Sequence, residues 1–239
     1  MLFRQLFDQE SCTYTYLIAD TDSKAAILVD SVLEQVERDL KLLKELGLAL
    51  RYCVETHVHA DHIIGADKLR AVTGCLGIVP SHAQVSCADR HIDDGEHLTL
   101  GAITLKAIAT PGHTDSHMAY QVDNRVLTGD ALFIRGCGRT DFQSGNAGTL
   151  YDSVTQRLFT LPDTALIYPG HDYRGHTVST IGEEKRWNPR FVNLEATDQG
   201  LRDRQSFIKF MTDLNLPNPK KMMEAVPANE LCGRATVVV

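Results

Sequence analysis

Four residues of the kinds that bind metal ions lie close together, in the order His57, His59, Asp61 and His62. His57 and His59 are two positions apart, so an extended backbone directs both side chains to the same side. Imidazole nitrogens and carboxylate oxygens suit zinc, iron or manganese, and no cysteine accompanies them in this stretch. The group predicts a metal-binding loop at the point where a strand gives way to a helix.

Three more residues of this kind occupy similar places further along the chain. His113 and His171 each follow a Pro-Gly pair, and Asp130 follows a glycine. Each polar residue ends an apolar stretch, and in layered α/β folds such strand ends meet at one edge, where ligands bind. The sequence therefore predicts that all seven residues form one cluster. Four other histidines lack such a pattern and are interpreted as structural or surface residues, namely His82, His91, His97 and His176. His117 lies near His113 but is not favoured as a ligand.

The elements that must position these residues alternate between strands and helices. Short apolar or β-branched runs predict strands over 12–20, 25–29, 51–56, 76–79, 98–100, 103–108, 118–122, 125–128 and 165–168. Helical periodicity predicts helices over 32–46, 63–72, 149–161, 177–187 and 198–214, and three prolines predict an irregular tail. Alternation with hairpins in the middle indicates an α/β sandwich of mixed sheets.

Length, composition and charge narrow the classes further. With 239 residues, 43% hydrophobic and 23% charged, we expect one globular domain over 1–239, with a C-terminal helical or irregular extension from about 188. A net charge of −7 without a Lys/Arg cluster predicts no nucleic-acid partner, and the short apolar runs predict no membrane span. No secretory signal is recognisable, so we expect a cytoplasmic protein whose six scattered cysteines are reduced.

Several motifs carry a resemblance to known families. THVHADH at 56–62, PGH at 111–113, GD at 129–130 and PGHD at 169–172 resemble the metallo-β-lactamase superfamily. The string TGDALFIRGCGRTDF at 128–142 resembles the persulfide dioxygenases within it, as do LIYPGHDY at 166–173, NPR at 188–190 and AVPAN at 225–229. The resemblance implies an αββα sandwich, two mixed sheets flanked by helices, with the metal at one edge.

The resemblance also implies an activity and a cofactor. It implies a mononuclear non-haem iron enzyme, with one Fe(II) per chain held by His57, His113 and Asp130. The expected reaction oxidises glutathione persulfide with O2 and water to sulfite and glutathione. His59, Asp61, His62 and His171 would then orient ligands and waters by hydrogen bonds. A homodimer is the assembly that the resemblance suggests.

Glutathione carries two carboxylates, so we expect a guanidinium near the site. Arg139 and Arg190 match basic positions of the family motifs and are the candidates, and Tyr173 could donate a hydrogen bond to the substrate. The alternatives are an ion pair of Arg139 with Asp141 and a helix-end contact of Arg190. Cys137 is interpreted as inert packing.

Two other functions fit the same residues. Seven ligand-type residues suffice for two metals, so a dinuclear zinc thioester hydrolase of the glyoxalase II type is an alternative. A non-catalytic persulfide- or thiol-binding metalloprotein is the other. Metal content separates the first from an iron enzyme, and oxygen uptake separates the second.

Overall fold

The computed structural model describes residues 1–194 and 200–234, which divide into two compact units. The first unit comprises residues 1–93 and 97–105 and the C-terminal part from Asn218; the second comprises 94–96 and 106–217. None of the described helices has the length and apolarity needed to cross a membrane. The expectation that 1–239 form one domain, with an extension from about 188, stays a prediction.

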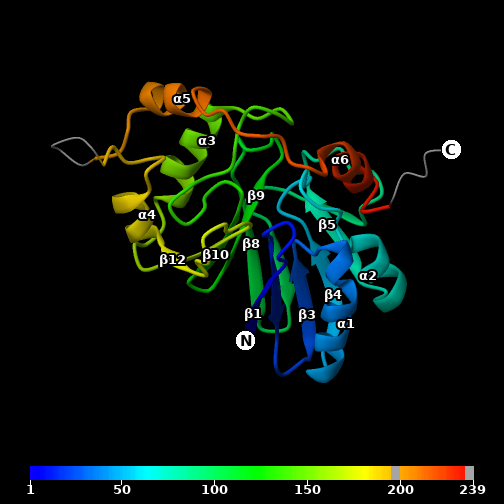
Figure 1. Ribbon diagram of the computed structural model, residues 1–239. Helices are drawn as coiled ribbons and strands as arrows, with labels where there is room; N and C mark the ends of the chain where they lie inside the picture. Colours follow the sequence, from blue (N-terminus) through cyan, green and yellow to red (C-terminus); the bar gives the residue numbers. More distant parts are fainter. Residues whose placement is uncertain (195–199, 235–239) are drawn as a thin grey trace. The chain divides into compact units, whose positions relative to one another are not determined.

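The first sheet belongs to the first unit and has the strand order β1-β2-β3-β4-β5-β6 (Figure 1). Its strands are β1 (Leu2–Phe7), β2 (Tyr14–Ala19), β3 (Ala25–Val29), β4 (Ala49–Val54), β5 (Leu76–Pro80) and β6 (Arg90–Ile92). The pairs β1-β2 and β2-β3 are antiparallel, whereas the pairs from β3 to β6 are parallel. The sheet is therefore mixed, as predicted. The three-residue β6 is too short to have shown a pattern in the sequence.

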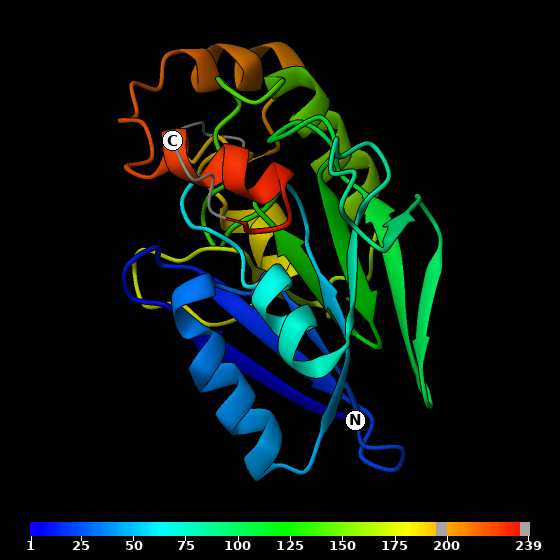
Figure 2. The ribbon, with the colours of Figure 1, turned by 90° about the vertical axis from the view of Figure 1, so that its right-hand side faces the viewer.

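Two helices cover one face of this sheet, α1 (Val36–Glu45) and α2 (Ala66–Thr73), as Figures 1 and 2 show together. A short 3-10 turn, η1 (Leu33–Gln35), precedes α1. Val36 and Leu43 of α1 are buried in one apolar cluster with strand residues such as Leu17 and Leu28. Gly74 takes a positive φ of 71° directly after α2, a conformation in which glycine carries no Cβ penalty. Both helices that periodicity predicts in this part are present, with shorter N-terminal ends.

The tail differs from the irregular segment expected. Residues Met222–Glu230 form helix α6, with Pro227 inside it. Ala225 and Ala228 of this helix are buried against Ile63. Packing of this apolar face offsets the backbone hydrogen bond that Pro227 cannot donate. The prolines alone therefore misled the prediction.

The second sheet has the order β12-β11-β10-β9-β8-β7. Its strands are β7 (His97–Leu100), β8 (Ile103–Ala109), β9 (Met118–Val122), β10 (Arg125–Gly129), β11 (Leu166–Pro169) and β12 (Ser179–Thr180). The pairs β8-β9, β9-β10 and β11-β12 are antiparallel and β10-β11 is parallel, so this sheet is mixed too. Strand β7 and the start of β8 fall in the first unit, and the rest in the second.

The helices of the second unit are α3 (Ala147–Ser153), continued by a π-helical turn η2 (Val154–Leu158), then α4 (Ile181–Trp187) and α5 (Arg204–Thr212). Helices α3 and α5 lie side by side in both ribbon views (Figures 1 and 2). Phe191 and Phe207 stack with centroids 4.8 Å apart in the core beneath them. The predicted helix 198–214 corresponds to α5, and its first two positions lie outside the described residues.

A buried polar network fixes the loop that follows β10. The carboxylate of Glu184, which has no exposed surface, is paired with Arg135 and accepts the backbone N–H of Arg135 at 2.8 Å. Asn188 donates to the carbonyls of Phe133 and Gly136 at 3.3 and 3.0 Å and to Glu184 at 2.9 Å. Buried polar groups are stable only when they are paired in this way. The NPR motif thus contributes an anchor for this loop.

The cysteines correct one expectation. Cys87 and Cys232 form a disulfide within the first unit, although all six were expected to be reduced. The two lie 145 positions apart, so no local spacing announces their pairing. Cys12, Cys53, Cys75 and Cys137 are free thiols, as expected.

Candidate functional site

The metal loop, residues 57–62, follows β4 in the first unit. Thr56 precedes it, and its hydroxyl donates to Asp30 Oδ2 at 2.9 Å and lies 2.9 Å from His57 Nδ1. A hydroxyl has one proton, and a carboxylate can only accept, so Thr56 accepts its second bond from Nδ1–H of His57. This fixes the tautomer of His57 with an unprotonated Nε2, which is the form that binds a metal ion.

His59 lies at the base of the same loop and has no exposed surface. Its Nε2 is 3.2 Å from Asp30 Oδ1 and 3.5 Å from Glu55 Oε2. Burial lowers the pKa of His59, but the two carboxylates outweigh it and raise this pKa to about 10. Burial raises the pKa of Glu55 to about 7. His59 Nδ1 has no hydrogen-bond partner within the described residues.

His62 and Asp61 complete the loop. His62 Nδ1 lies 2.9 Å from Asp61 Oδ2 and 3.4 Å from Thr13 Oγ1. The opposite nitrogen, His62 Nε2, is buried and makes no hydrogen bond to any described residue. One ligand atom from each of His59, Asp61 and His62 lies within 4.8 Å of the others. The buried Nε2 of His62 fits a metal site, because burying an unsatisfied polar atom is otherwise costly.

In the second unit, His113 follows β8, and a backbone carbonyl fixes the orientation of its ring. Its Nδ1 lies 2.7 Å from the carbonyl oxygen of Arg139, to which it can only donate. Nε2 is therefore the unprotonated nitrogen, and it lies 3.6 Å from Asp130 Oδ2. This separation is too long for a hydrogen bond. It is close to the spacing of two ligand atoms on one ion, since each metal–ligand bond is about 2.0–2.2 Å.

Asp130 follows β10, and both its carboxylate and its backbone N–H are hydrogen-bonded to histidines. His171 Nδ1 lies 2.7 Å from Oδ1 of Asp130, so the imidazole donates to that oxygen. The backbone N–H of Asp130 donates to His117 Nε2 at 3.0 Å, and His117 Nδ1 lies 2.8 Å from Thr110 Oγ1. The sequence did not favour His117 as a functional residue. In the structure it accepts the backbone N–H of Asp130, a predicted ligand.

Two glycines allow these strand ends to approach. A Cβ at Gly112 would lie 2.3 Å from the backbone nitrogen of Leu150, and φ at Gly112 is +133°. A Cβ at Gly170 would lie 2.6 Å from Asp130 Oδ1. Both are shorter than real Cβ contacts, so the Pro-Gly pairs are needed for the turns that present His113 and His171.

The predicted substrate residues have different surroundings. The Arg139 guanidinium makes two 2.6 Å bonds to Asp141 and donates to the carbonyls of Pro217 and Leu216 at 2.6 and 3.3 Å. Its side chain therefore ties its own loop, as the alternative interpretation expects. The Arg190 guanidinium lies over the Phe210 ring at 5.3 Å and forms no ion pair within the described residues.

Tyr173 and Cys137 differ in exposure, since Tyr173 lies at the surface and Cys137 is buried. The Tyr173 ring is 68% exposed and stacks on His171 with centroids 6.0 Å apart. Burial raises the pKa of Cys137 to about 12, so this thiol stays protonated at neutral pH. That agrees with inert packing for Cys137.

Each unit thus brings its own predicted residues together. In the first unit the rings of His57, His59 and His62 are neighbours, with centroids 4.1 and 4.5 Å apart. In the second unit His113 and His171 both lie against Asp130. The motifs did not identify the residues that hydrogen-bond to these side chains or to their backbone, namely Asp30, Glu55, Thr56, His117 and Asn229. Thr56 and Asn229 did carry a signal, because Thr56 begins the THVHADH motif and Asn229 ends the AVPAN motif.

Comparisons with known proteins show the family of the chain. A model described as the metallo-beta-lactamase superfamily matches residues 12–171. The chain therefore belongs to the metallo-β-lactamase superfamily, and the predicted class, two mixed sheets flanked by helices, is confirmed.

Within that superfamily, the chain is similar to the persulfide dioxygenases. It is 48% identical over 239 residues to proteins named "Persulfide dioxygenase ETHE1, mitochondrial" from cattle and from human, covering 99% of this chain and 90% of each relative. A crystal structure of ETHE1 from Myxococcus xanthus matches with a TM-score of 0.92 and 50% identity, covering 98% of this chain and all of that one. The chain belongs with the persulfide dioxygenases, so the predicted family and its enzyme class, an oxidoreductase, are confirmed.

Proposed function

We propose that this chain oxidises the terminal sulfur of glutathione persulfide with O2, using one iron ion held by His57, His113 and Asp130. The overall reaction joins the persulfide, O2 and water and yields glutathione and sulfurous acid, which ionises to sulfite. Sulfur, oxygen and hydrogen balance in this equation. The near full-length similarity to persulfide dioxygenases supports the persulfide and O2.

The observation that carries the metal assignment is the orientation of the donor atoms. The proton on His57 Nδ1 goes to Thr56, and that on His113 Nδ1 goes to Arg139 O, so both Nε2 atoms can bind a cation. Asp130 keeps Oδ2 for the same purpose while Oδ1 accepts from His171. Two imidazoles and one carboxylate are the donor set of oxygen-activating iron enzymes. Iron in that set supplies the electron transfer to oxygen.

The chain's own residues then position the reactants. His171 orients Asp130, since its Nδ1–H donates to the carboxylate. Arg190, whose guanidinium forms no ion pair in the described residues, is the better candidate for a glutathione carboxylate. Arg139 acts through its loop, since its guanidinium is already engaged and its carbonyl orients His113. Tyr173 offers an exposed hydroxyl beside His171 for a substrate hydrogen bond.

The test is metal analysis of protein purified without chelator, combined with oxygen uptake on freshly prepared glutathione persulfide. We expect about one iron per chain and oxygen consumption with sulfite formation. His113→Ala should lose both, whereas the exposed His82→Ala should keep both. Iron retained with full activity in His113→Ala would contradict the ligand assignment.

The group of His59, Asp61 and His62 favours one alternative strongly enough to be tested alongside. Its ligand atoms could hold a second ion, as a dinuclear zinc thioester hydrolase requires. Two zinc ions per chain, thioester hydrolysis and no oxygen uptake would support that enzyme and overturn the iron proposal. A stoichiometric iron content without oxygen uptake on any persulfide would instead favour the binding protein.

Three expectations stay predictions. Two relatives are named as mitochondrial, and a cytoplasmic location for this chain is a proposal. So is a homodimer. The lack of a nucleic-acid or membrane partner also remains an expectation from charge and hydropathy.

A further inference from the structure

The side chain of Asn229 joins helix α6 to the backbone of the metal loop. Its Nδ2 donates to the carbonyl of His59 at 2.9 Å and to that of His62 at 2.8 Å. Its Oδ1 accepts the backbone N–H of Ile64 at 2.9 Å. Asn229 is buried, so these bonds are shielded from competing water. One carboxamide thus fixes three backbone groups over residues 59–64, in the metal loop and directly after it.

The residues after Asn229 continue this contact. The carbonyl of Cys232 accepts the N–H of Asp67 at 3.1 Å, where α2 begins. Gly233 lies so close to the loop that a Cβ there would come within 2.2 Å of the carbonyl oxygen of Ile64. Ala225 and Ala228 also pack against Ile63. The C-terminal segment, residues 222–233, therefore packs over the residues that directly follow the metal loop.

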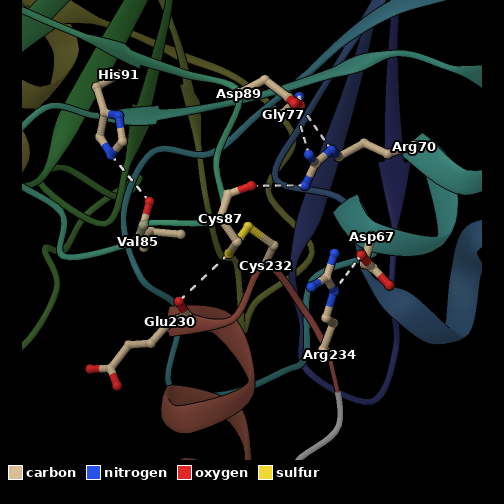
Figure 3. The surroundings of a disulfide bond; sticks show 10 residues. All are labelled: Asp67, Arg70, Gly77, Val85, Cys87, Asp89, His91, Glu230, Cys232 and Arg234. Carbon is tan, nitrogen blue, oxygen red and sulfur yellow. Dashed lines mark hydrogen bonds and ion pairs between the residues drawn. A yellow bond between two sulfur atoms is a disulfide. The ribbon is translucent and has the colours of Figure 1, made fainter.

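A covalent bond holds this C-terminal segment in place. Figure 3 shows the Cys87–Cys232 disulfide beside the end of α6. Arg70 anchors the other side, because its guanidinium donates to the carbonyl of Cys87 at 3.1 Å and to Asp89 at 2.8 Å. Asp89 in turn accepts the N–H of Gly77 in β5 at 2.7 Å. The disulfide therefore connects the C-terminal segment to the parallel part of the first sheet.

We propose that the C-terminal segment is a clamp on the metal loop, in which Asn229 is the positioning residue and the Cys87–Cys232 disulfide is a latch that thiols can open. Asn229 lies three residues before Cys232, so release of the cysteine frees the turn that seats the carboxamide. The metal loop then loses the hydrogen bonds that hold the backbone of His59 and His62.

The opening step needs a reductant, and a low-molecular-weight thiol is the class proposed. A thiolate attacks the sulfur of Cys87, which is partly exposed whereas Cys232 is buried, and the S–S bond breaks as the Cys232 thiolate leaves. A second thiol then attacks the mixed disulfide. Two cysteine thiols and one small disulfide result, so the chain gains two electrons and two protons.

Amide hydrogen exchange tests the clamp without any metal. The N–H of Ile64 donates to Asn229, whereas the N–H of Gly65, one residue on, donates to the carbonyl of Ser31 at 2.9 Å. In Asn229→Ala we expect Ile64 to exchange about 10-fold faster, with Gly65 as the internal reference. Unchanged exchange at Ile64 in this variant would overturn the clamp.

The latch is tested on the wild-type chain by adding dithiothreitol and counting free thiols. Once two further thiols have appeared, Ile64 should exchange faster, as it should in Cys87→Ser without reductant. Cys12→Ser removes a free thiol of the same unit and should change nothing. Two further thiols with unchanged Ile64 exchange would overturn the latch and leave the positioning role of Asn229 standing.

The metal readout rests on the proposed function. Release of bound Fe(II) to a chelator should be about 10-fold faster in Asn229→Ala and Asn229→Asp, because the loop that carries the proposed ligand His57 loses its support. Asn229→Asp keeps the size and the acceptor for Ile64, but a carboxylate can donate to neither carbonyl. It should therefore speed release while keeping Ile64 protected. Because exchange is measured without metal, a chain that binds no iron would fail the proposed function and not the clamp.

Discussion

The metal loop of the first unit and the strand ends of the second unit hold their polar residues in contrasting ways. In the first unit the ligand-type residues are consecutive in sequence, and their supports come from far away: Asp30 lies 26 positions from Thr56, and Asn229 lies 170 from His59. In the second unit the residues come from separate strand ends and support one another, as His171 does for Asp130. A contiguous loop needs outside partners because it has no sheet register of its own.

This difference predicts where each region is vulnerable. Removing a support should disturb the first unit's loop as a whole, since one side chain such as Asn229 fixes several backbone groups. Removing one residue in the second unit should act locally, because β10 and β11 already fix the backbone. Four variants test this contrast, in decreasing order of expected effect.

Asp130→Ala should abolish both metal retention and persulfide oxidation, because it removes a proposed ligand and leaves His171 without its acceptor. The unfolding midpoint should change little, since the strand end is held by the sheet. Metal analysis, oxygen uptake and thermal unfolding give the three readouts, with the exposed Asp22→Ala as the control. A large loss of stability would show that the second unit depends on this residue as much as the loop depends on its supports.

Arg135→Leu should destabilise the chain by about 3–5 kcal/mol, because it leaves Glu184 as an unpaired buried charge. Urea unfolding measures this. Lys185→Ala, which breaks a largely exposed pair with Asp163, should cost no more than about 1 kcal/mol. An equal effect of the two variants would mean that the network behind the β10 loop is not what stabilises it.

Thr56→Val keeps the shape of the side chain and removes the hydroxyl between Asp30 and His57. Metal affinity should fall about 10- to 100-fold, the range found when a group orienting a ligand is removed. Competition with a chelator measures it, and Thr160→Val, an exposed threonine, is the matched control. Unchanged metal affinity would show that His57 is oriented without the hydrogen bonds that link it through Thr56 to Asp30.

Asp39 lies in α1, away from the loop, and separates general stability of the first unit from metal retention. Burial raises the pKa of Asp39 to about 6, and Arg38 lowers it only in part. A folded-state pKa above the unfolded value means that stability is highest below about pH 4 and declines as pH rises through about 6. Asp39→Asn should therefore stabilise the chain by about 2 kcal/mol at pH 7.5 and by almost nothing at pH 4.

Urea unfolding at both pH values checks this expectation, with the exposed Glu37→Gln in the same helix as the control. Metal affinity should be unchanged in both variants. A gain in metal affinity in Asp39→Asn would show that the loop simply follows the stability of its unit.

Much of the fold could be predicted because periodicity and turn residues are local signals. The strands around 25–29 and 125–128 and the helix ending at Gly74 follow from short patterns. Helix α6 could not be predicted in this way, because its stability comes from Ala225 and Ala228 packing on Ile63, a contact between distant parts of the chain.

The candidate site divides along the same line. His57 to His62 stand out because the residue types are adjacent, and His113, Asp130 and His171 stand out because each follows a glycine. The roles of Thr56 and His117 could not be recognised, although Thr56 begins the THVHADH motif, because what either residue holds is visible only in its hydrogen bonds. The Cys87–Cys232 pair was hidden for the same reason.

The distance along the chain between the metal loop and Asn229 has a consequence for biosynthesis. During translation, His59 leaves the ribosome 170 residues before the side chain that seats its carbonyl. The loop can thus reach its final conformation only after Asn229 has been synthesised, and the disulfide can close only after Cys232 has followed. Any ion that binds the nascent chain earlier meets an unfinished loop, so stable metal binding in this part of the protein must follow the synthesis of α6.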